Sequence, residues 1–352
     1  MNVQVKEQQK IRLDALPILD LKQFEDLKTQ KKFIEKLQKI SKEIGFFYLT
    51  GHGISQSQIE GMQKITQAFF QLSQSEKDSL GMIHSPHFRG YTRPNSENTR
   101  NLPDFREQID IGVELNVVEA SSSEQLPIWA QLQGPNQWPE HWPEFKTTVT
   151  AWQQNLRQVS LKLLRALLLS LEQSEHALDY LVTGTPNELL KLIHYPKVNQ
   201  KDHQGVGPHK DSNILTLLLQ DQIGGLQVLS QGHWIDVPYI ENAFVVNIGE
   251  ILELVTNGYL IANQHRVISP EYADRYSIAY FLSPKLFAGQ IKILDLPEHL
   301  RIQAQGPETD PLNPLLGHVG ENCIKGRLRS HLDVTQKYYP EQYEQLIKAR
   351  LN

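Results

Sequence analysis

The sequence contains little of what covalent crosslinking or membrane insertion requires. Cys323 is the single cysteine in 352 residues, which excludes an intrachain disulfide framework. The longest apolar stretch, residues 161–171, carries basic residues and falls well short of the roughly 20 residues that a membrane helix needs. The first residues lack the apolar core of a secretory signal. We therefore expect a cytoplasmic protein with no membrane partner.

An excess of positive charge is also absent. The formal net charge is −5, so the chain has no basic field of the kind that attracts nucleic acid, and nucleic acid is disfavoured as a partner. Hydrophobic residues make up 39% of the chain and charged residues 21%, as is ordinary for a globular protein. No repeat of fixed period and no Gly/Ser-rich linker divides the chain, which indicates one integrated unit.

The spacing of apolar residues changes along the chain. A period of 3.6 predicts helices over residues 23–44 and 56–73, and the strongest predicted helix, over 145–173, is typical of a scaffold packed on a sheet. From residue 190 onward, short strand-like runs alternate with Gly, Asn, Asp or Pro, which favours an antiparallel sandwich or jelly roll over βαβ units. The tail from about residue 311 is expected to be mostly helical.

A histidine and an aspartate stand two positions apart before one of these strands. On a strand, positions i and i+2 point to the same face, so His209 and Asp211 could bind one ion together. The motif is weak by itself, because the chain contains 13 histidines and a second copy at His331 and Asp333. No later histidine follows His331, and polar residues surround it, so we assign it to the solvated surface.

Further along the chain, His265 offers a third ligand from a distant strand. Two imidazoles and one carboxylate on one face of a metal are suited to oxygen-activating Fe(II), because positions stay open for other ligands. Ten residues later, Arg275 and Ser277 share a strand face, where a guanidinium beside a hydroxyl suits a carboxylate. This pair could hold the far end of a dicarboxylate whose near end chelates the metal. Tyr195 adds a hydroxyl from an adjacent strand.

Several short motifs occur in one order along the chain: LPILDL, GFFYLTGHGI, YP, HKD, GGLQV, VVNIGEILELVTNG, NQHRV and RYS. This ordered set resembles the isopenicillin N synthase-like branch of the Fe(II) and 2-oxoglutarate-dependent dioxygenases, over most of residues 14–285. The resemblance implies a distorted double-stranded β-helix, a jelly roll whose open mouth holds the metal. We therefore expect a fold that is mainly β with flanking helices.

The resemblance also implies cofactors and the residues that bind them. His209, Asp211 and His265 are expected to bind Fe(II). Arg275 and Ser277 are expected to grip the C5 carboxylate of 2-oxoglutarate, assisted by Tyr195.

The implied reaction is the oxidation of a small-molecule substrate by O2, through hydroxylation, desaturation or cyclisation, with release of succinate and CO2. Candidate substrate contacts are Arg89, Tyr91 and Phe281. One departure is Ile193, which stands where many plant members have Asn two residues before the tyrosine of the YP motif. A contact to the cosubstrate is therefore absent or replaced.

We expect one integrated catalytic unit in three parts. These are an N-terminal mixed α/β region over residues 1–120, a jelly-roll core with its scaffold helix over 121–290, and a C-terminal helical extension over 291–352. Three alternative functions stay open from the sequence. The first is an Fe(II) oxidase of the isopenicillin N synthase type that needs no 2-oxoglutarate, because such relatives also keep the RxS motif. The others are a non-catalytic small-molecule-binding relative and a zinc hydrolase.

Overall fold

The computed structural model describes residues 16–120, 125–200, 202–308 and 313–351. The first residues, which we examined for a secretory signal, and the start of the expected helical tail at about residue 311 lie outside the described residues. Within the described part of the chain, no helix is long and apolar enough to cross a membrane.

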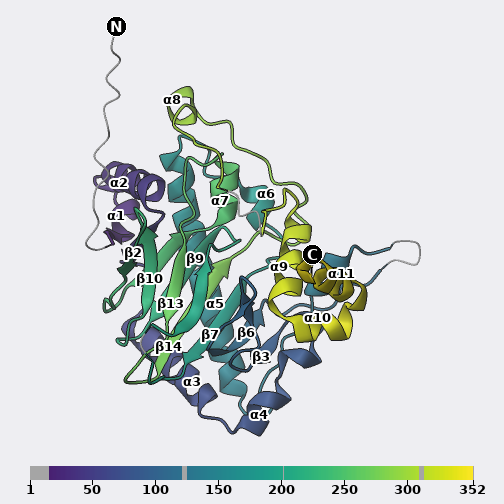
Figure 1. Cartoon of the computed structure of the whole chain (residues 1–352). Coiled ribbons are helices and arrows are strands. Elements are labelled where there is room, and N and C mark those ends of the chain that lie inside the picture. Colours follow the sequence, from purple (N-terminus) through teal and green to yellow (C-terminus); the bar gives the residue numbers. More distant parts are fainter. Residues whose placement is uncertain (1–15, 121–124, 201, 309–312, 352) are drawn as a thin grey trace.

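Two sheets form the centre of the molecule (Figure 1). The larger sheet has eight strands, in the order β1 (Ile18–Asp20), β2 (Phe46–Thr50), β12 (Phe244–Ile248), β9 (Leu215–Gln220), β14 (Arg275–Leu282), β7 (Leu189–Tyr195), β6 (Glu107–Gly112) and β3 (Gly90–Thr92). The smaller sheet has four strands, in the order β11 (His233–Asp236), β10 (Leu226–Ser230), β13 (His265–Ile268) and β8 (Gln204–His209). Neighbouring strands are antiparallel except β1 and β2.

Strands from the N-terminal half of the chain form both edges of the larger sheet. Strands β1 and β2 extend one edge through β12, and β6 and β3 extend the other through β7. A two-stranded ribbon, β4 (Asn98–Thr99) and β5 (Leu102–Pro103), lies between β3 and β6 in the sequence. The N-terminal residues therefore share the sheet of the predicted core.

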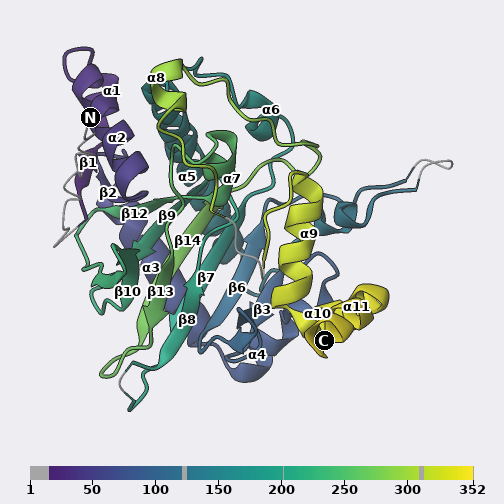
Figure 2. The same ribbon diagram turned by 45° about the horizontal axis from the view of Figure 1, so that its top comes forward.

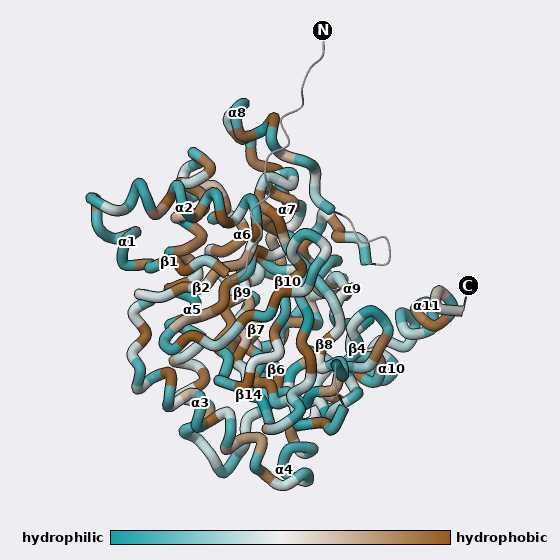
Figure 3. The backbone as a smooth tube through the Cα atoms, turned by 60° about the vertical axis from the view of Figure 1, so that its left-hand side comes forward, coloured by the Kyte–Doolittle hydropathy of each residue, from teal (hydrophilic) through white to brown (hydrophobic). Residues whose placement is uncertain are grey.

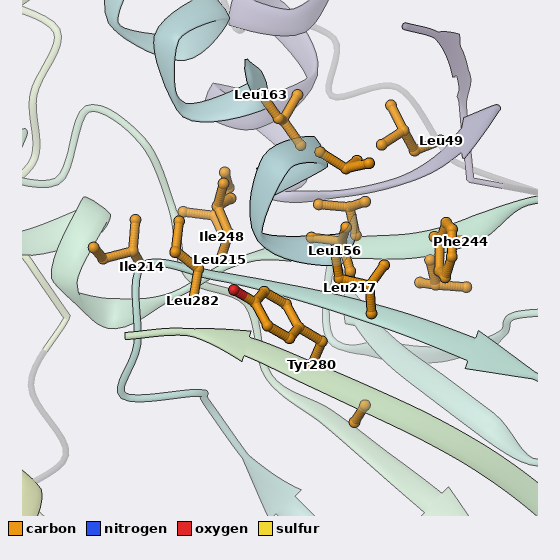
Figure 4. Packing of buried hydrophobic residues seen from close by; sticks show 14 of the residues in the cluster. Leu49, Leu156, Leu163, Ile214, Leu215, Leu217, Phe244, Ile248, Tyr280 and Leu282 are labelled. Atoms are coloured by element: carbon orange, nitrogen blue, oxygen red, sulfur yellow. The ribbon is translucent and has the colours of Figure 1, made fainter. Parts of the chain in front are cut away.

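Helix α5 (Pro143–Ser170) supports the larger sheet. Its apolar side chains recur at helical spacing, and Pro143 occupies the first turn, where a missing N–H is tolerated. Figure 4 shows Leu156 and Leu163 of this helix packed over Leu215 and Leu217 of β9. These four leucines are all fully buried, and burial of each side chain contributes about 1.5–3 kcal/mol. The helix thereby holds the sheet in place behind the site.

The other helices surround this core (Figure 2). On the N-terminal side lie α1 (Lys22–Glu25), α2 (Gln30–Glu43), α3 (Gln56–Phe70) and α4 (Gln74–Ser79), and later segments contribute α6 (Asp179–Val182), α7 (Glu250–Val255) and α8 (Glu298–Arg301). The tail forms α9 (Val319–Ser330), α10 (Leu332–Tyr338) and α11 (Pro340–Leu351), and two 3₁₀ turns span Met82–His84 and Ile128–Leu132. In Figure 3, α1 and α4 are mostly hydrophilic, whereas β9 in the larger sheet is mostly hydrophobic.

Candidate metal centre and cosubstrate site

The structure brings together the three residues that the sequence singled out as metal ligands. His209 ends β8 and His265 begins β13, and the two are direct partners across the ladder, with ring centroids 4.2 Å apart. Asp211 Oδ1 lies 3.5 Å from His209 Nε2 and 3.7 Å from His265 Nε2. The candidate ligand atoms all lie within 4.8 Å of one another, a cluster that fits around one ion.

Asp211 reaches this cluster from a loop rather than from a strand. Strand β8 ends at His209, so the sequence argument that both residues share one strand face is wrong in this detail. The carboxylate is oriented instead by two donors on the larger sheet. Thr216 Oγ1 and Asn247 Nδ2 donate to Asp211 Oδ2, at 2.5 and 2.9 Å. Because both donors hold Oδ2, Oδ1 is left to face the two histidines.

Backbone carbonyls orient the two imidazoles. His209 Nδ1 lies 2.8 Å from the carbonyl oxygen of Gly207, and His265 Nδ1 lies 3.4 Å from that of Asn263. A carbonyl accepts only, so each Nδ1 carries the proton and each Nε2 presents its lone pair to the cluster. This is the tautomer that metal-binding histidines adopt when the second ring nitrogen is held by a hydrogen bond.

The electrostatics of the cluster favour a neutral His265 and an ionised Asp211, which are the protonation states in which these residues can bind a metal. Burial and the neighbouring His209 lower the pKa of His265 to about 4. Burial would raise the pKa of Asp211, but the two histidines and Thr216 hold it well below its usual range. Burial would also lower the pKa of His209, but its contact with Asp211 raises it. A cation would take the place of that proton, because a ligating imidazole is neutral.

A second group of predicted residues lies on β14 and β7. Arg275 is fully buried and pairs with Tyr195 across the ladder, with its guanidinium 4.7 Å from the centre of the tyrosine ring. Its Nη1 lies 3.5 Å from Ser277 Oγ, while Nε and Nη2 have no hydrogen-bond partner among the described residues. An unpaired buried guanidinium is costly, so this arrangement fits an anionic ligand such as the distal carboxylate of a dicarboxylate.

Two family models cover most of this architecture. Residues 16–141 match the model described as non-haem dioxygenase in morphine synthesis N-terminal, and residues 186–284 match the 2OG-Fe(II) oxygenase superfamily. The 2-oxoglutarate-dependent dioxygenase frbJ of Dothideomycetidae sp. is 31% identical over 349 residues, which cover 93% of this chain and 93% of that protein. The chain belongs to the 2OG-Fe(II) oxygenase superfamily.

Other relatives and solved structures agree with this assignment. A homoarginine-6-hydroxylase of Arabidopsis thaliana is 34% identical over 272 residues, which cover 75% of this chain and 80% of that protein. The crystal structure of a full-length Neurospora crassa protein in complex with alpha-KG superposes with a TM-score of 0.72 and 26% identity, over 91% of this chain and 98% of that chain.

These findings confirm four sequence predictions. The fold is mainly β with flanking helices, consistent with a distorted double-stranded β-helix, and the resemblance to the dioxygenases holds. This oxygenase uses Fe(II), 2-oxoglutarate and O2. It is an oxidoreductase that oxidises a small molecule with release of succinate and CO2.

A cavity of about 500 Å³ opens over the candidate ligands of this oxygenase. His209 and Asp211 line it together with Phe281 and Arg89, two of the predicted substrate contacts. Tyr91 does not belong to this lining. It is buried in β3, where its hydroxyl donates to Glu107 Oε2 at 2.5 Å. The predicted substrate role of Tyr91 therefore has no support from its position and stays a prediction.

The assignment of His331 to the solvated surface is wrong. Its side chain is 1% exposed and its Nε2 lies 3.6 Å from Glu97 Oε1, whereas Asp333 is exposed. The cause is the packing of α9 and α10 against the N-terminal half of the chain, which covers the histidine. Apolar Leu328, Val334 and Tyr339 flank His331, and these were the sequence signal for a buried segment.

Sequence reasoning also missed several polar residues beside the cavity. All of them are buried or half-buried: Glu97, Arg106, Asp110, Lys191 and Arg327 lie in or next to the cavity wall, and Thr216 and Asn247 hold Asp211. Charge pairing between distant segments leaves no local pattern, so no motif pointed to these residues.

Proposed function

We propose that His209, Asp211 and His265 hold the Fe(II) of this oxygenase. The observation that carries the proposal is the convergence of their ligand atoms within 4.8 Å, from two paired strands and the loop between β8 and β9. The donor set of two imidazoles and one carboxylate is the one that suits non-haem Fe(II). When bound, the iron couples the oxidative decarboxylation of 2-oxoglutarate by O2 to oxidation of the substrate.

The protein's own residues orient the reactants. We assign the distal carboxylate of 2-oxoglutarate to Arg275 and Ser277, with Tyr195 beneath the guanidinium, because two donors of Arg275 are buried without partners. The charge of Arg275 would then be balanced by the cosubstrate. The relative named as a 2-oxoglutarate-dependent dioxygenase favours 2-oxoglutarate over the alternative of an oxidase that takes all its electrons from its substrate.

The cavity wall positions the substrate. We assign substrate contacts to Arg89 and Phe281, which line the same cavity as His209 and Asp211. Because the homoarginine-6-hydroxylases are named for hydroxylation, we propose hydroxylation as the outcome of the reaction. The product would then contain one oxygen atom more than the substrate, which mass spectrometry detects.

We also propose that the three predicted parts act as one integrated catalytic unit. Residues 1–120 supply β1, β2, β3 and β6 to the sheet, residues 121–290 supply the candidate ligands, and residues 291–352 supply helix α9 to the cavity wall. The single cysteine and the net charge of −5 support a cytoplasmic enzyme that acts on a diffusible small molecule, without nucleic acid or membrane as a partner.

The cosubstrate assignment is tested with Arg275→Gln. Loss of a charge-assisted, two-pronged contact is expected to raise the apparent KM for 2-oxoglutarate by at least about tenfold and to leave the concentration of Fe(II) for half-maximal activity nearly unchanged. The measurement is succinate formation in separate titrations of 2-oxoglutarate and Fe(II). The control is Arg266→Gln, which changes a half-buried arginine of β13 that stacks on Trp234. Equal increases in both requirements would contradict the assignment.

A further inference from the structure

One end of the cavity gathers three cations from distant parts of the chain. Arg89 directly precedes β3, Lys191 lies in β7 and Arg327 lies in α9, and all three line the same cavity as His209 and Asp211. Arg89 and Lys191 are 6% and 7% exposed. We call these three residues the basic end of the cavity.

The carboxylates of this region are already shared between cations. Glu97 accepts from Lys191 Nζ at 2.9 Å and from Arg106 Nη2 at 2.7 Å. Asp110 accepts from Arg327 Nη1 at 2.7 Å and lies 3.7 Å from Lys191 Nζ. Asp104 Oδ2 also lies 3.4 Å from Arg106 Nη2, so three carboxylates already serve Lys191, Arg106 and Arg327 before Arg89 is counted.

Arg89 has no carboxylate of its own. Its guanidinium donates to the carbonyl oxygens of His87 and Leu132, at 3.2 and 3.3 Å, and no ion pair joins it to an acidic residue in the described part of the chain. Burial and the nearby charge of Arg327 lower its pKa to about 10, so it stays charged at neutral pH. Gly112 makes room for it, since a Cβ there would lie 2.3 Å from Arg89 Nε.

Arg327 has donors to spare. Its Nη1 is bonded to Asp110, and no second acceptor for its guanidinium is found among the described residues. Its side chain keeps 17% exposure, on the wall of the cavity. A guanidinium with one edge anchored and another facing a cavity is arranged to receive a planar anion.

Several other charges of the cavity wall are paired with one another. Lys210 pairs with Glu253 at 3.1 Å and with Glu308 at 2.8 Å, and Glu188 pairs with Arg157. Asp211 belongs to the metal cluster, and 2-oxoglutarate brings its own charge to Arg275. None of these pairs includes Arg89, Lys191 or Arg327.

We propose that the substrate of this oxygenase is a small organic carboxylate whose carboxyl group docks on Arg327 and Lys191, with Arg89 adding positive charge behind them. The inference rests on the proposed function, since it places the substrate in the cavity over the candidate iron ligands. A cavity of about 500 Å³ lies within the range of pockets for small molecules. A substrate docked there occupies the same cavity that His209 and Asp211 line.

Direct binding tests this inference without knowledge of the natural substrate. The probes are matched pairs of an acid and its primary amide: phenylacetate with phenylacetamide, and hexanoate with hexanamide. The dissociation constant of each probe is measured by saturation-transfer NMR with the anaerobic holoenzyme, saturated with Fe(II) and 2-oxoglutarate. The dissociation constants of the acids are expected to be at least about tenfold lower than those of the amides. Equal binding within the pairs, or failure of both acids to bind, would overturn the inference.

Variants at Arg327 test whether this residue causes the preference for acids over amides. Arg327→Gln is expected to weaken acid binding by about tenfold or more with little effect on the amides, whereas Arg327→Lys keeps part of the preference. The control is Arg301→Gln, an arginine that is 61% exposed in α8. Thermal unfolding of each variant shows whether it is folded. If the Arg327 variants do not fold, the comparison of acids with amides on the wild-type protein alone decides the inference. Unchanged acid binding in a folded Arg327→Gln variant would also overturn the inference.

Failure of the proposed function can be distinguished from failure of the carboxylate inference. If wild-type enzyme forms no succinate from 2-oxoglutarate with Fe(II) and O2, the oxygenase assignment of the site is at fault, whatever the probes do. If succinate forms and the amides bind as well as the acids, only the carboxylate inference is lost.

Discussion

At the scale of single residues, Asp211 shows how a carboxylate is prepared to bind a metal. One of its oxygens accepts from Thr216 and Asn247, and the other faces the histidines. A freely rotating carboxylate would lose conformational entropy on binding, and this one has already been fixed by the fold. The two donors are thus positioning residues that act through Asp211.

Replacement of Thr216 measures how much this donor contributes to the affinity for Fe(II). Thr216→Val removes the hydroxyl and keeps the shape of the side chain, so the expected result is an Fe(II) affinity lower by about 10- to 100-fold. Anaerobic titration with Fe(II) gives the affinity. Thr147→Val is the matched control, because Thr147 is an exposed residue of α5 whose hydroxyl donates to Pro143. Identical affinities in both variants would show that Asp211 needs no positioning.

At the scale of elements, the site depends on where strands end. The pairing of β8 with β13 sets His209 opposite His265, and that of β14 with β7 sets Arg275 opposite Tyr195. Helix α7 then closes the loop after Asp211, since the Glu250 N–H donates to the Asp211 carbonyl oxygen at 2.8 Å. The Glu250 side chain, at the first position of α7, is 7% exposed and lines the cavity.

Glu250 predicts a pH-dependent stability. Burial raises its pKa from 4.5 to about 7, so the folded protein holds a proton there that the unfolded chain releases between these values. Stability is therefore lost as the pH rises through this window. Relative to wild type, Glu250→Gln is expected to gain stability between pH 5 and pH 8, by up to about 3 kcal/mol. Urea unfolding at several pH values measures the gain, and the exposed Glu298→Gln variant should show none.

At the scale of the whole molecule, the site joins separate layers. The candidate histidine ligands lie on the smaller sheet, the donors to Asp211 and the residues that we assign to 2-oxoglutarate lie on the larger sheet, and helix α9 completes the cavity wall. Iron and cosubstrate bound between these layers would connect them. Binding to the folded state alone raises its stability by mass action.

Metal removal is expected to reverse this effect. Fe(II) and 2-oxoglutarate, each at about 100 times its dissociation constant under anaerobic conditions, should each stabilise the wild type by about 2.7 kcal/mol. A chelator should return the melting temperature to that of the free protein. Differential scanning calorimetry measures both changes. The His209→Ala variant should show little response to iron, and a full response in that variant would contradict the ligand assignment.

Local patterns in the sequence determined the residue types and order of the site. His209, Asp211, His265 and Arg275 occur in short motifs next to strands, and strand periodicity is a local property that single segments reveal. The same holds for α5, whose apolar spacing predicted a scaffold helix close to its observed bounds of Pro143–Ser170. These features depend on neighbours in sequence, so the sequence was sufficient for them.

Only the tertiary structure decided which charges are buried together. Strand β6 carries Glu107 and Asp110 in a fully buried stretch, His331 is buried at the junction of α9 and α10, and Arg327 meets Asp110 across 217 positions of the chain. A charged residue resembles a surface residue until its partner is known, because burial becomes affordable only when a distant opposite charge or a ligand balances it. The basic end of the cavity is such a product of long-range packing.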